Sequence, residues 1–215
     1  MEIQYINTDQ LTRSRLEVKI VRAKSPLLFW VQLKNSERDL QELEEELNLR
    51  MYRRATYLHI WPEQMKEGMD VAVQSNKSWR RGFINKMNKN TWMVQVSLGD
   101  WGRVIWRKMS EVYLLEDRFR ELPWQTIVCG LAYTGPALDS TIWPTETREL
   151  CRLLLEEHKG WINIVHPLRD GAALVKLCMQ TQTTENTSYN FRDALIRLGH
   201  ARLADKVTVD TYPAV

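Results

Sequence analysis

The feature that most constrains the fold is a series of short strand-like segments between residues 70 and 114. Each is rich in strand-forming residues, and short links containing Ser, Asn, Asp or Gly separate one from the next. Short strands that recur about every ten residues and are joined by tight turns are typical of a small antiparallel barrel. In the third segment Trp92, Val94, Val96 and Leu98 alternate with other residues and are expected to face the core. The predicted strands are residues 70–75, 79–87, 92–98, 103–106 and 111–114.

Mixed structure flanks this predicted barrel. Residues 15–23 alternate apolar and polar side chains, and residues 28–33 form a second apolar run, so both predict strands. Residues 36–53 predict an amphipathic helix, with Ser36 as the N-cap, acidic residues early and basic residues late. Downstream we expect strands at residues 125–132, 161–165 and 171–179, a turn at 135–136, a loop at 180–188 and helices at 144–157 and 189–204. This order favours a small barrel inserted into a second domain whose early and late strands share one sheet.

Composition excludes several classes of protein. The 215 residues are 44% hydrophobic, and 30 Lys and Arg against 27 Asp and Glu leave a net charge of +3, unlike a histone or a polyelectrolyte tail. We expect no membrane span and no secretory signal. Three cysteines without CxxC spacing favour a reduced, intracellular chain without a metal site. No nucleophile, phosphate-binding or zinc-protease motif is present, so no catalytic residue and no cofactor is predicted.

Nine tryptophans are the unusual part of the composition, and they belong either to the core or to a recognition surface. In residues 63–108 nine Lys and Arg stand against four Asp and Glu, which leaves +5, whereas residues 37–49 carry six acids and one Arg, which leaves −5. Basic residues between tryptophans suit single-stranded RNA, because bases can stack on the rings while cations hold phosphates. Loops with aromatic side chains can instead hold a cationic group of a peptide. Both functions remain open at this point.

The stretch GMDVAVQSNKSWRRGFINKMNKNTWMVQVSLGDWGR, residues 68–103, resembles a Tudor barrel, whose pattern runs G-x-x-x-A, W-Y-R-A and F-x-D-Y-G-N. The flanking segments SPLLFWVQL, RELPWQTIVCGLAYTGP and DALIRLGHA are similar to those of an extended Tudor domain. That resemblance implies a mixed β/α fold: an SH3-like Tudor β-barrel inserted into a staphylococcal-nuclease-like, OB-type β/α domain and joined to it by a long helix. The implied parts are residues 1–35, the first nuclease-like strands; 36–55, the linker helix; 56–116, the barrel; and 117–215, the remainder.

The resemblance also implies a function. Extended Tudor domains of germline piRNA-pathway scaffolds bind arginine-rich tails of Piwi-clade Argonautes, commonly through a symmetrically dimethylated arginine held in a cage of four aromatic residues. For this chain, the resemblance implies a non-enzymatic peptide-binding module that takes no metal. It also implies a place in the cytoplasm, in a perinuclear germ granule. No Arg/Arg/Glu nuclease set is present in the nuclease-like part.

The cage residues do not carry over to this sequence. Of the four aromatic positions only that of Tyr in D-Y-G-N is aromatic here, as Trp101, and Arg80 stands at another. Arg103 replaces the final Asn of that motif, which in the family holds the guanidinium by a hydrogen bond. A cation repels a methylated guanidinium, so we expect methylation to add little or nothing to peptide binding. Binding of an unmethylated arginine segment is the leading expectation, with RNA binding and methylarginine binding through an incomplete cage as alternatives. The candidate ligand-binding positions are Gln74, Arg80, Leu98, Trp101 and Arg103. Trp101 is the one indole assigned to recognition, and Trp92, Trp106, Trp124, Trp143 and Trp161 are assigned to packing.

Overall fold

The computed structural model describes residues 2–138, 142–181 and 187–204, and the chain in it divides into two compact units. One unit contains Met1–Tyr5 and Ser36–Gln125, and the other contains Ile6–Asn35 and Thr126–Val215. The first unit therefore interrupts the sequence of the second, as an inserted barrel does. The helix predicted at residues 36–53 and the segment 117–125 both group with the barrel unit.

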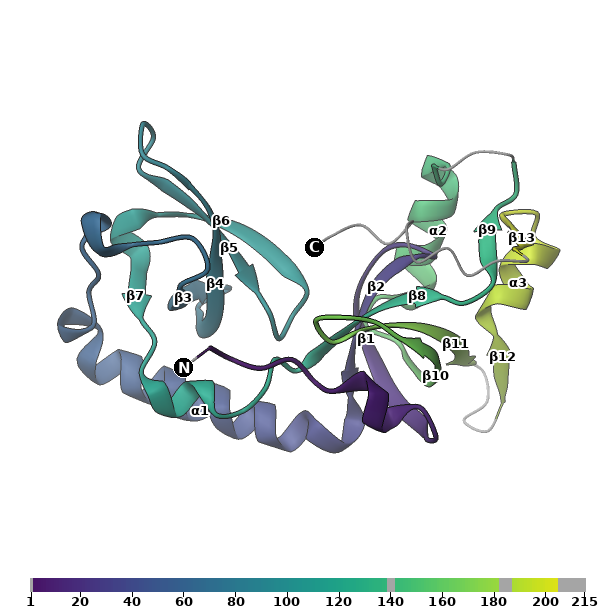
Figure 1. The fold of residues 1–215 in the computed structure, drawn as a ribbon, viewed down its shortest axis with the longest axis horizontal. Coiled ribbons are helices and arrows are strands. Elements are labelled where there is room, and N and C mark those ends of the chain that lie inside the picture. The colour runs from purple at the N-terminus through teal and green to yellow at the C-terminus, as the bar shows by residue number, and fades with distance from the viewer. Residues whose placement is uncertain (1, 139–141, 182–186, 205–215) are drawn as a thin grey trace. The chain divides into compact units, whose positions relative to one another are not determined.

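The inserted unit is built on a five-stranded antiparallel sheet with the order β6-β5-β4-β3-β7 (Figure 1). Its strands are β3 (Asp70–Ser75), β4 (Ser78–Asn88), β5 (Met93–Leu98), β6 (Arg103–Lys108) and β7 (Val112–Leu114). Each lies where the alternation of apolar residues predicts a strand. The side chains buried inside the barrel include Val71, Val73, Ile84, Val94, Val96, Leu98 and Val112.

Helix α1 (Glu37–Arg54) packs on the barrel through one apolar face. Leu40, Leu47 and Met51 are its buried residues, and Leu47 and Met51 join a cluster that contains Ala72 of β3 and Trp124. Ser36 occupies the N-cap position, as predicted, but its side chain makes no capping hydrogen bond. Burial of the apolar face, rather than a cap, is therefore what holds α1 in place.

The second unit contains a six-stranded sheet with the order β10-β1-β2-β8-β11-β12, in which β10 also pairs with β11 and closes a barrel. Strands β8 and β11 are parallel, and the other pairs are antiparallel. The early strands thus share a sheet with the late ones, as the sequence predicts. The strands are β1 (Arg15–Ser25), β2 (Leu28–Leu33), β8 (Thr126–Leu131), β10 (Lys159–Pro167), β11 (Ala172–Gln180) and β12 (Ser188–Asn190).

Shorter elements complete the second unit, and two of them correct the sequence-based prediction. The helix expected over residues 189–204 is confined to α3 (Phe191–Arg197), because Gly199 turns the chain with a φ of 75° and the backbone then pairs as a strand. That strand, β13 (Ala201–Leu203), pairs with β9 (Thr134–Pro136), where a turn was expected. Helix α2 (Thr145–Leu155) follows Pro144, as predicted. Of the loop expected at residues 180–188, residues 182–186 lie outside the described part.

Within residues 2–138, 142–181 and 187–204, six short 3₁₀ segments connect these elements. They are Thr8–Leu11, Lys34–Ser36, Ala55–Tyr57, Pro62–Gln64, Met109–Glu111 and Asp117–Arg120. No helix among the described residues is both long enough and apolar enough to cross a membrane. Cys129 and Cys151 are buried and Cys178 is half-buried, and burial raises the pKa of the Cys151 thiol to about 12.

The tryptophans divide differently from the expectation. Trp124 and Trp143 are buried, which confirms their assignment to packing. Trp92 and Trp106 are 58% and 48% exposed, so assigning them to packing was wrong. Trp92 has a φ of 56° and lies in the turn before β5, so the alternation that buries Val94 does not extend back to it. Two indoles of the barrel are thus available at its surface.

We expect the Arg50–Glu116 ion pair to make stability depend on pH. Arg50 Nε and Nη2 of α1 donate to the two carboxylate oxygens of Glu116, each at 2.6 Å, and this holds the pKa of Glu116 below its ordinary 4.5. A lowered pKa in the folded state contributes stability above the unfolded-state pKa, and this stability is lost as the pH falls through the folded-state pKa. Urea unfolding of Glu116→Gln should therefore show a loss of about 1 kcal/mol at neutral pH that disappears under acid conditions. A loss that is independent of pH would contradict this interpretation.

Candidate functional site

A buried ion pair organises the turn between β5 and β6. Arg81 of β4 is 1% exposed and Asp100 of the turn is 2% exposed. Arg81 Nε donates to Asp100 Oδ2 at 2.7 Å, and Arg81 Nη2 donates to Asp100 Oδ1 at 2.9 Å. This two-point geometry is the strongest that a guanidinium and a carboxylate can form.

The remaining donors of Arg81 reach a segment that follows the barrel strands. Nη1 donates to the carbonyl oxygens of Phe119 and Leu122, at 2.8 and 2.6 Å, and Nη2 donates to that of Pro123 at 2.6 Å. Each of the five N–H groups of the guanidinium thus has an acceptor. Asp100 Oδ1 also accepts from the backbone N–H of Gln125 at 2.8 Å. The ion pair therefore ties β4, the β5–β6 turn and residues 119–125 together.

Sequence reasoning did not identify this pair, because adjacent basic residues such as Arg80 and Arg81 are more often solvated on a strand, whereas Arg81 is buried. The available signal was the motif itself: Arg81 stands at the Arg of W-Y-R-A and Asp100 at the Asp of F-x-D-Y-G-N. The sequence alone left two roles open for Arg81 and Asp100, an ion pair inside the protein or contacts with a ligand. The burial of both side chains shows that they form an internal ion pair.

The β5–β6 turn places Trp101 at the edge of the barrel. Gly99 lies so close to Trp124 that a Cβ atom would come within 2.4 Å of the indole, and Gly102 has a φ of 58°. Both positions favour glycine, because Gly99 has no space for a side chain and Gly102 adopts a left-handed backbone conformation. The backbone N–H of Trp101 donates to the carbonyl of Leu98 at 3.0 Å and closes the turn.

Trp101 lies against an arginine and a glutamate of the same unit. The Arg80 guanidinium carbon is 3.8 Å from the centroid of the Trp101 ring, so the cation covers one face of the indole. Trp101 Nε1 donates to Glu44 Oε1 of α1 at 2.9 Å, and Arg80 Nε lies 3.8 Å from the same oxygen. We call Glu44, Arg80 and Trp101 the stacked triad.

The electrostatics of the stacked triad reflect partial burial. Arg80 and Glu44 side chains are 16% and 24% exposed. Burial raises the pKa of the Glu44 carboxyl, while Arg80 and the hydrogen bond from Trp101 oppose that rise. Burial also lowers the pKa of Arg80, with Arg103 adding to the effect and Glu44 opposing it. Arg103 is therefore close enough to raise the positive potential at the triad.

The five candidate positions are only partly brought together. Arg80 and Trp101 are in contact, and Arg103 acts on Arg80 through its charge. Leu98 is 1% exposed within the barrel core, so its side chain is not available to a ligand. Gln74 is exposed at the end of β3, and its carbonyl accepts from Arg107 Nε at 2.9 Å. Glu44 was not among the candidates because it lies on α1, 57 residues from Trp101.

Within the described residues, no three His, Cys, Asp or Glu side chains form a group that could hold a metal ion. The fold is a small five-stranded barrel inserted into a closed β/α domain. A family model for the Tudor domain matches residues 11–133, more than half of the chain. The chain belongs to the Tudor family.

Relatives and solved structures agree with this family. Tudor domain-containing protein 5 of Rattus norvegicus and of Mus musculus are each 27% identical over 190 residues, which is 82% of this chain. The chain spans only 18% and 17% of the length of those two proteins.

The structural comparisons show the extended Tudor fold. An extended Tudor domain of mouse TDRD1, in complex with a dimethylarginine-containing MILI peptide, has a TM-score of 0.82 at 17% identity, covering 95% of this chain and all of that one. The Drosophila melanogaster Papi extended Tudor domain, a variant in complex with an unmethylated Piwi N-terminal peptide, has a TM-score of 0.75 at 19% identity. That match covers 88% of this chain and 99% of the Papi chain.

Asp100→Asn should destabilise the barrel unit by about 3–5 kcal/mol, because the amide leaves the buried charge of Arg81 without a counter-ion. Urea denaturation followed by tryptophan fluorescence measures the change. Asp117→Asn is the matched control, since Asp117 is 88% exposed and is expected to cost less than about 1 kcal/mol. Equal losses in the two variants would show that the ion pair is not a main support of the barrel.

Proposed function

We propose that this chain is a non-enzymatic peptide-binding module that recognises an arginine-containing segment of a Piwi-clade Argonaute and does not require arginine methylation. The observation that carries the proposal is the contact between Arg80 and Trp101. A ring face that would stack on the guanidinium of a ligand is already covered by a guanidinium of the chain itself. Peptide recognition therefore has to rely on other contacts.

Displacing Arg80 from the ring would be unfavourable. The side chain is largely buried and its countercharge is Glu44, so moving it away separates a partly desolvated ion pair. Arg103 also places a second positive charge close by. Methylation of an arginine keeps its positive charge and blocks hydrogen bonds, so the methylated ligand meets the same repulsion as the unmethylated one. Methyl groups thus bring no gain that would offset the displacement.

The acidic surface of α1 supports an arginine-rich partner. Residues 37–49 have a net charge of −5, and Glu45 is among the exposed carboxylates. Such a surface attracts a basic segment before any specific contact forms. The structural neighbours support the same class of ligand, because the TDRD1 domain binds a dimethylarginine peptide and the Papi domain an unmethylated Piwi peptide. A place in cytoplasmic germ granules of the piRNA pathway is part of this proposal.

Isothermal titration calorimetry tests the proposal with matched peptides from a Piwi-clade Argonaute tail, one unmethylated and one symmetrically dimethylated. The wild-type chain should bind both with dissociation constants within about threefold, since a cation–π gain of about 0.5–2 kcal/mol is not available at Trp101. A preference of about tenfold or more for the dimethylated peptide, equal to about 1.4 kcal/mol, would contradict the proposal.

Removing the covering cation should restore part of the methylation dependence. In Arg80→Ala one face of Trp101 is free, so affinity for the dimethylated peptide should rise by about 2- to 30-fold over wild type, as one cation–π contact allows. The same titration measures the change. Arg197→Ala is the matched control, because Arg197 is exposed on α3, outside the acidic surface of α1, and its removal should leave both affinities unchanged. If Arg80→Ala does not bind the dimethylated peptide more tightly than the wild type, the covered ring of Trp101 is not what makes binding independent of methylation.

A further inference from the structure

The outer face of β4, β5 and β6 presents an indole among basic and polar side chains. Lys86, Gln95 and Trp106 are paired across the three strands, and paired residues share one face of a sheet. The next row on that face is Asn88, Met93 and Lys108. We call these two rows the outer face. It is a different part of the barrel from the stacked triad and shares no residue with it.

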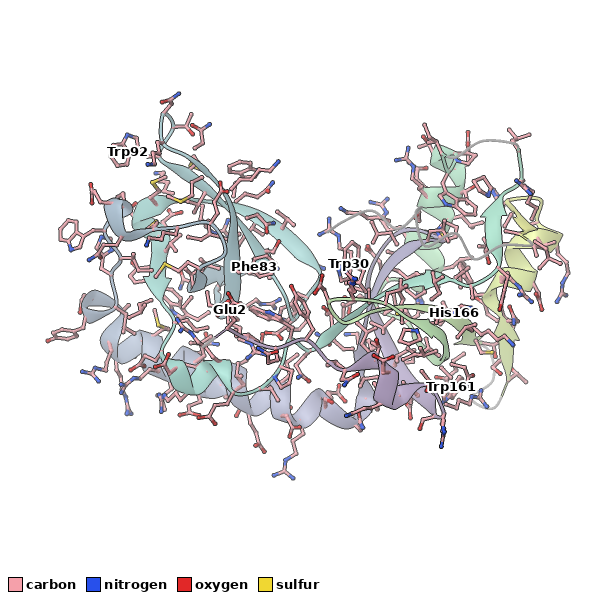
Figure 2. The ribbon with its side chains drawn as sticks, viewed as in Figure 1. Glu2, Trp30, Phe83, Trp92, Trp161 and His166 are labelled. Carbon is pink, nitrogen blue, oxygen red and sulfur yellow. The ribbon has the colours of Figure 1, made fainter. Side chains whose placement is uncertain are left out.

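An open cavity of about 670 Å³ adjoins the outer face, and Trp106 forms part of its wall. Trp106 is 48% exposed, whereas Val96 on the adjacent strand β5 is fully buried. Figure 2 shows Trp92 beside the β4–β5 hairpin, and it is 58% exposed. An exposed indole that lines a cavity, as Trp106 does, is typical of recognition surfaces. The cavity is lined by Met65, Glu67, Lys86, Met87, Asn88, Lys89, Asn90 and Trp106.

The charge around this cavity is positive. Lys86 and Lys89 line it and Lys108 lies on the adjacent row, and within the described residues none of these three ammonium groups forms an ion pair with a carboxylate. Glu67 is the one carboxylate among the lining residues, and its Oε1 accepts from the backbone N–H of Met87 at 3.1 Å. Two lysines and one engaged acid therefore line the cavity, with Lys108 on the neighbouring row, where its backbone N–H donates to Glu111 Oε2 at 3.2 Å.

The lysines stand on a defined support. Asn88 Oδ1 accepts from the backbone N–H groups of Asn90 and Thr91, at 3.1 and 3.2 Å, and this closes the hairpin that carries Lys89. Lys86 lies on β4 itself, two residues before Asn88. Ligand binding at these positions needs no ordering of the backbone, so the loss of conformational entropy is confined to the side chains.

We propose that the outer face binds single-stranded nucleic acid, with a base stacked on Trp106 and phosphates held by Lys86, Lys89 and Lys108. The repeating unit of such a strand offers both a planar ring and an anion, which matches both parts of the surface. A run of acidic residues such as polyglutamate matches the cations but offers no ring for the indole. A duplex presents its phosphates but keeps its base faces stacked internally. RNA and DNA share the chemistry that this surface recognises.

Fluorescence anisotropy of labelled strands about 12 nucleotides long tests the inference, because this length lies within the site sizes of small single-strand-binding folds. The full chain should bind single-stranded RNA or DNA more tightly than a duplex or a polyglutamate of equal charge. Trp106→Ala should weaken binding by about tenfold, as removal of one stacked base predicts. The double substitution Lys86→Gln with Lys89→Gln should lower the slope of log affinity against log salt by about 1.4, because each phosphate that a lysine neutralises contributes about 0.7.

Matched controls separate this site from general charge attraction. Lys77→Gln changes an exposed lysine at the other end of β4, and Tyr52→Ala removes an aromatic ring that is 89% exposed on α1. Both variants should bind as the wild type does. The inference is overturned if no saturable binding occurs at low salt, if duplex or polyglutamate binds equally well, or if Trp106→Ala and the lysine variant behave like the controls. Thermal unfolding of each variant verifies that it is folded.

Discussion

The barrel unit depends on one buried ion pair between Arg81 and Asp100. Five N–H groups of the guanidinium have acceptors, two on the carboxylate and three on backbone carbonyls of residues 119–123. A buried charge is tolerated only when its hydrogen bonds are complete, and this network completes them. Because Asp100 belongs to the β5–β6 turn, the same network fixes the turn that carries Trp101. The geometry of the candidate site is therefore a consequence of the internal structure of the barrel.

Neighbouring arginines on β4 have opposite roles because successive side chains of a strand point to opposite faces. Arg81 pairs with Ala72, lies against Trp124 and forms the buried ion pair, while Arg80 pairs with Val73 on the opposite face and covers Trp101. Glu44 on α1 accepts from Trp101 and balances the charge of Arg80. The stacked triad thus satisfies within the chain an interaction that an aromatic cage would offer to a ligand.

Two indoles of the same barrel differ in whether other side chains of the chain already cover them. Arg80 covers one face of the Trp101 ring, and the indole N–H donates to Glu44, so both groups already have partners within the folded chain. Trp106 is half-exposed and lies beside lysines that no carboxylate of the described residues pairs with. The first arrangement favours recognition that is independent of methylation, and the second favours an anionic ligand with a planar ring. These two surfaces consist of separate residues, so each can function without the other.

Local pattern by itself determined most of the architecture. Alternation and turn residues predicted β3 with its observed bounds, and helical spacing predicted α1 to within one residue at each end. These features depend on neighbours in sequence, which periodicity reports directly. The Tudor identity of the inserted barrel was predicted by resemblance to the family's motifs. Tertiary structure alone decided that Arg81 is buried, that Arg80 covers Trp101 and that Trp106 is exposed. Each of those outcomes depends on side chains or backbone far along the chain, such as Asp100, Glu44 and residues 119–123, and only packing brings them within contact distance.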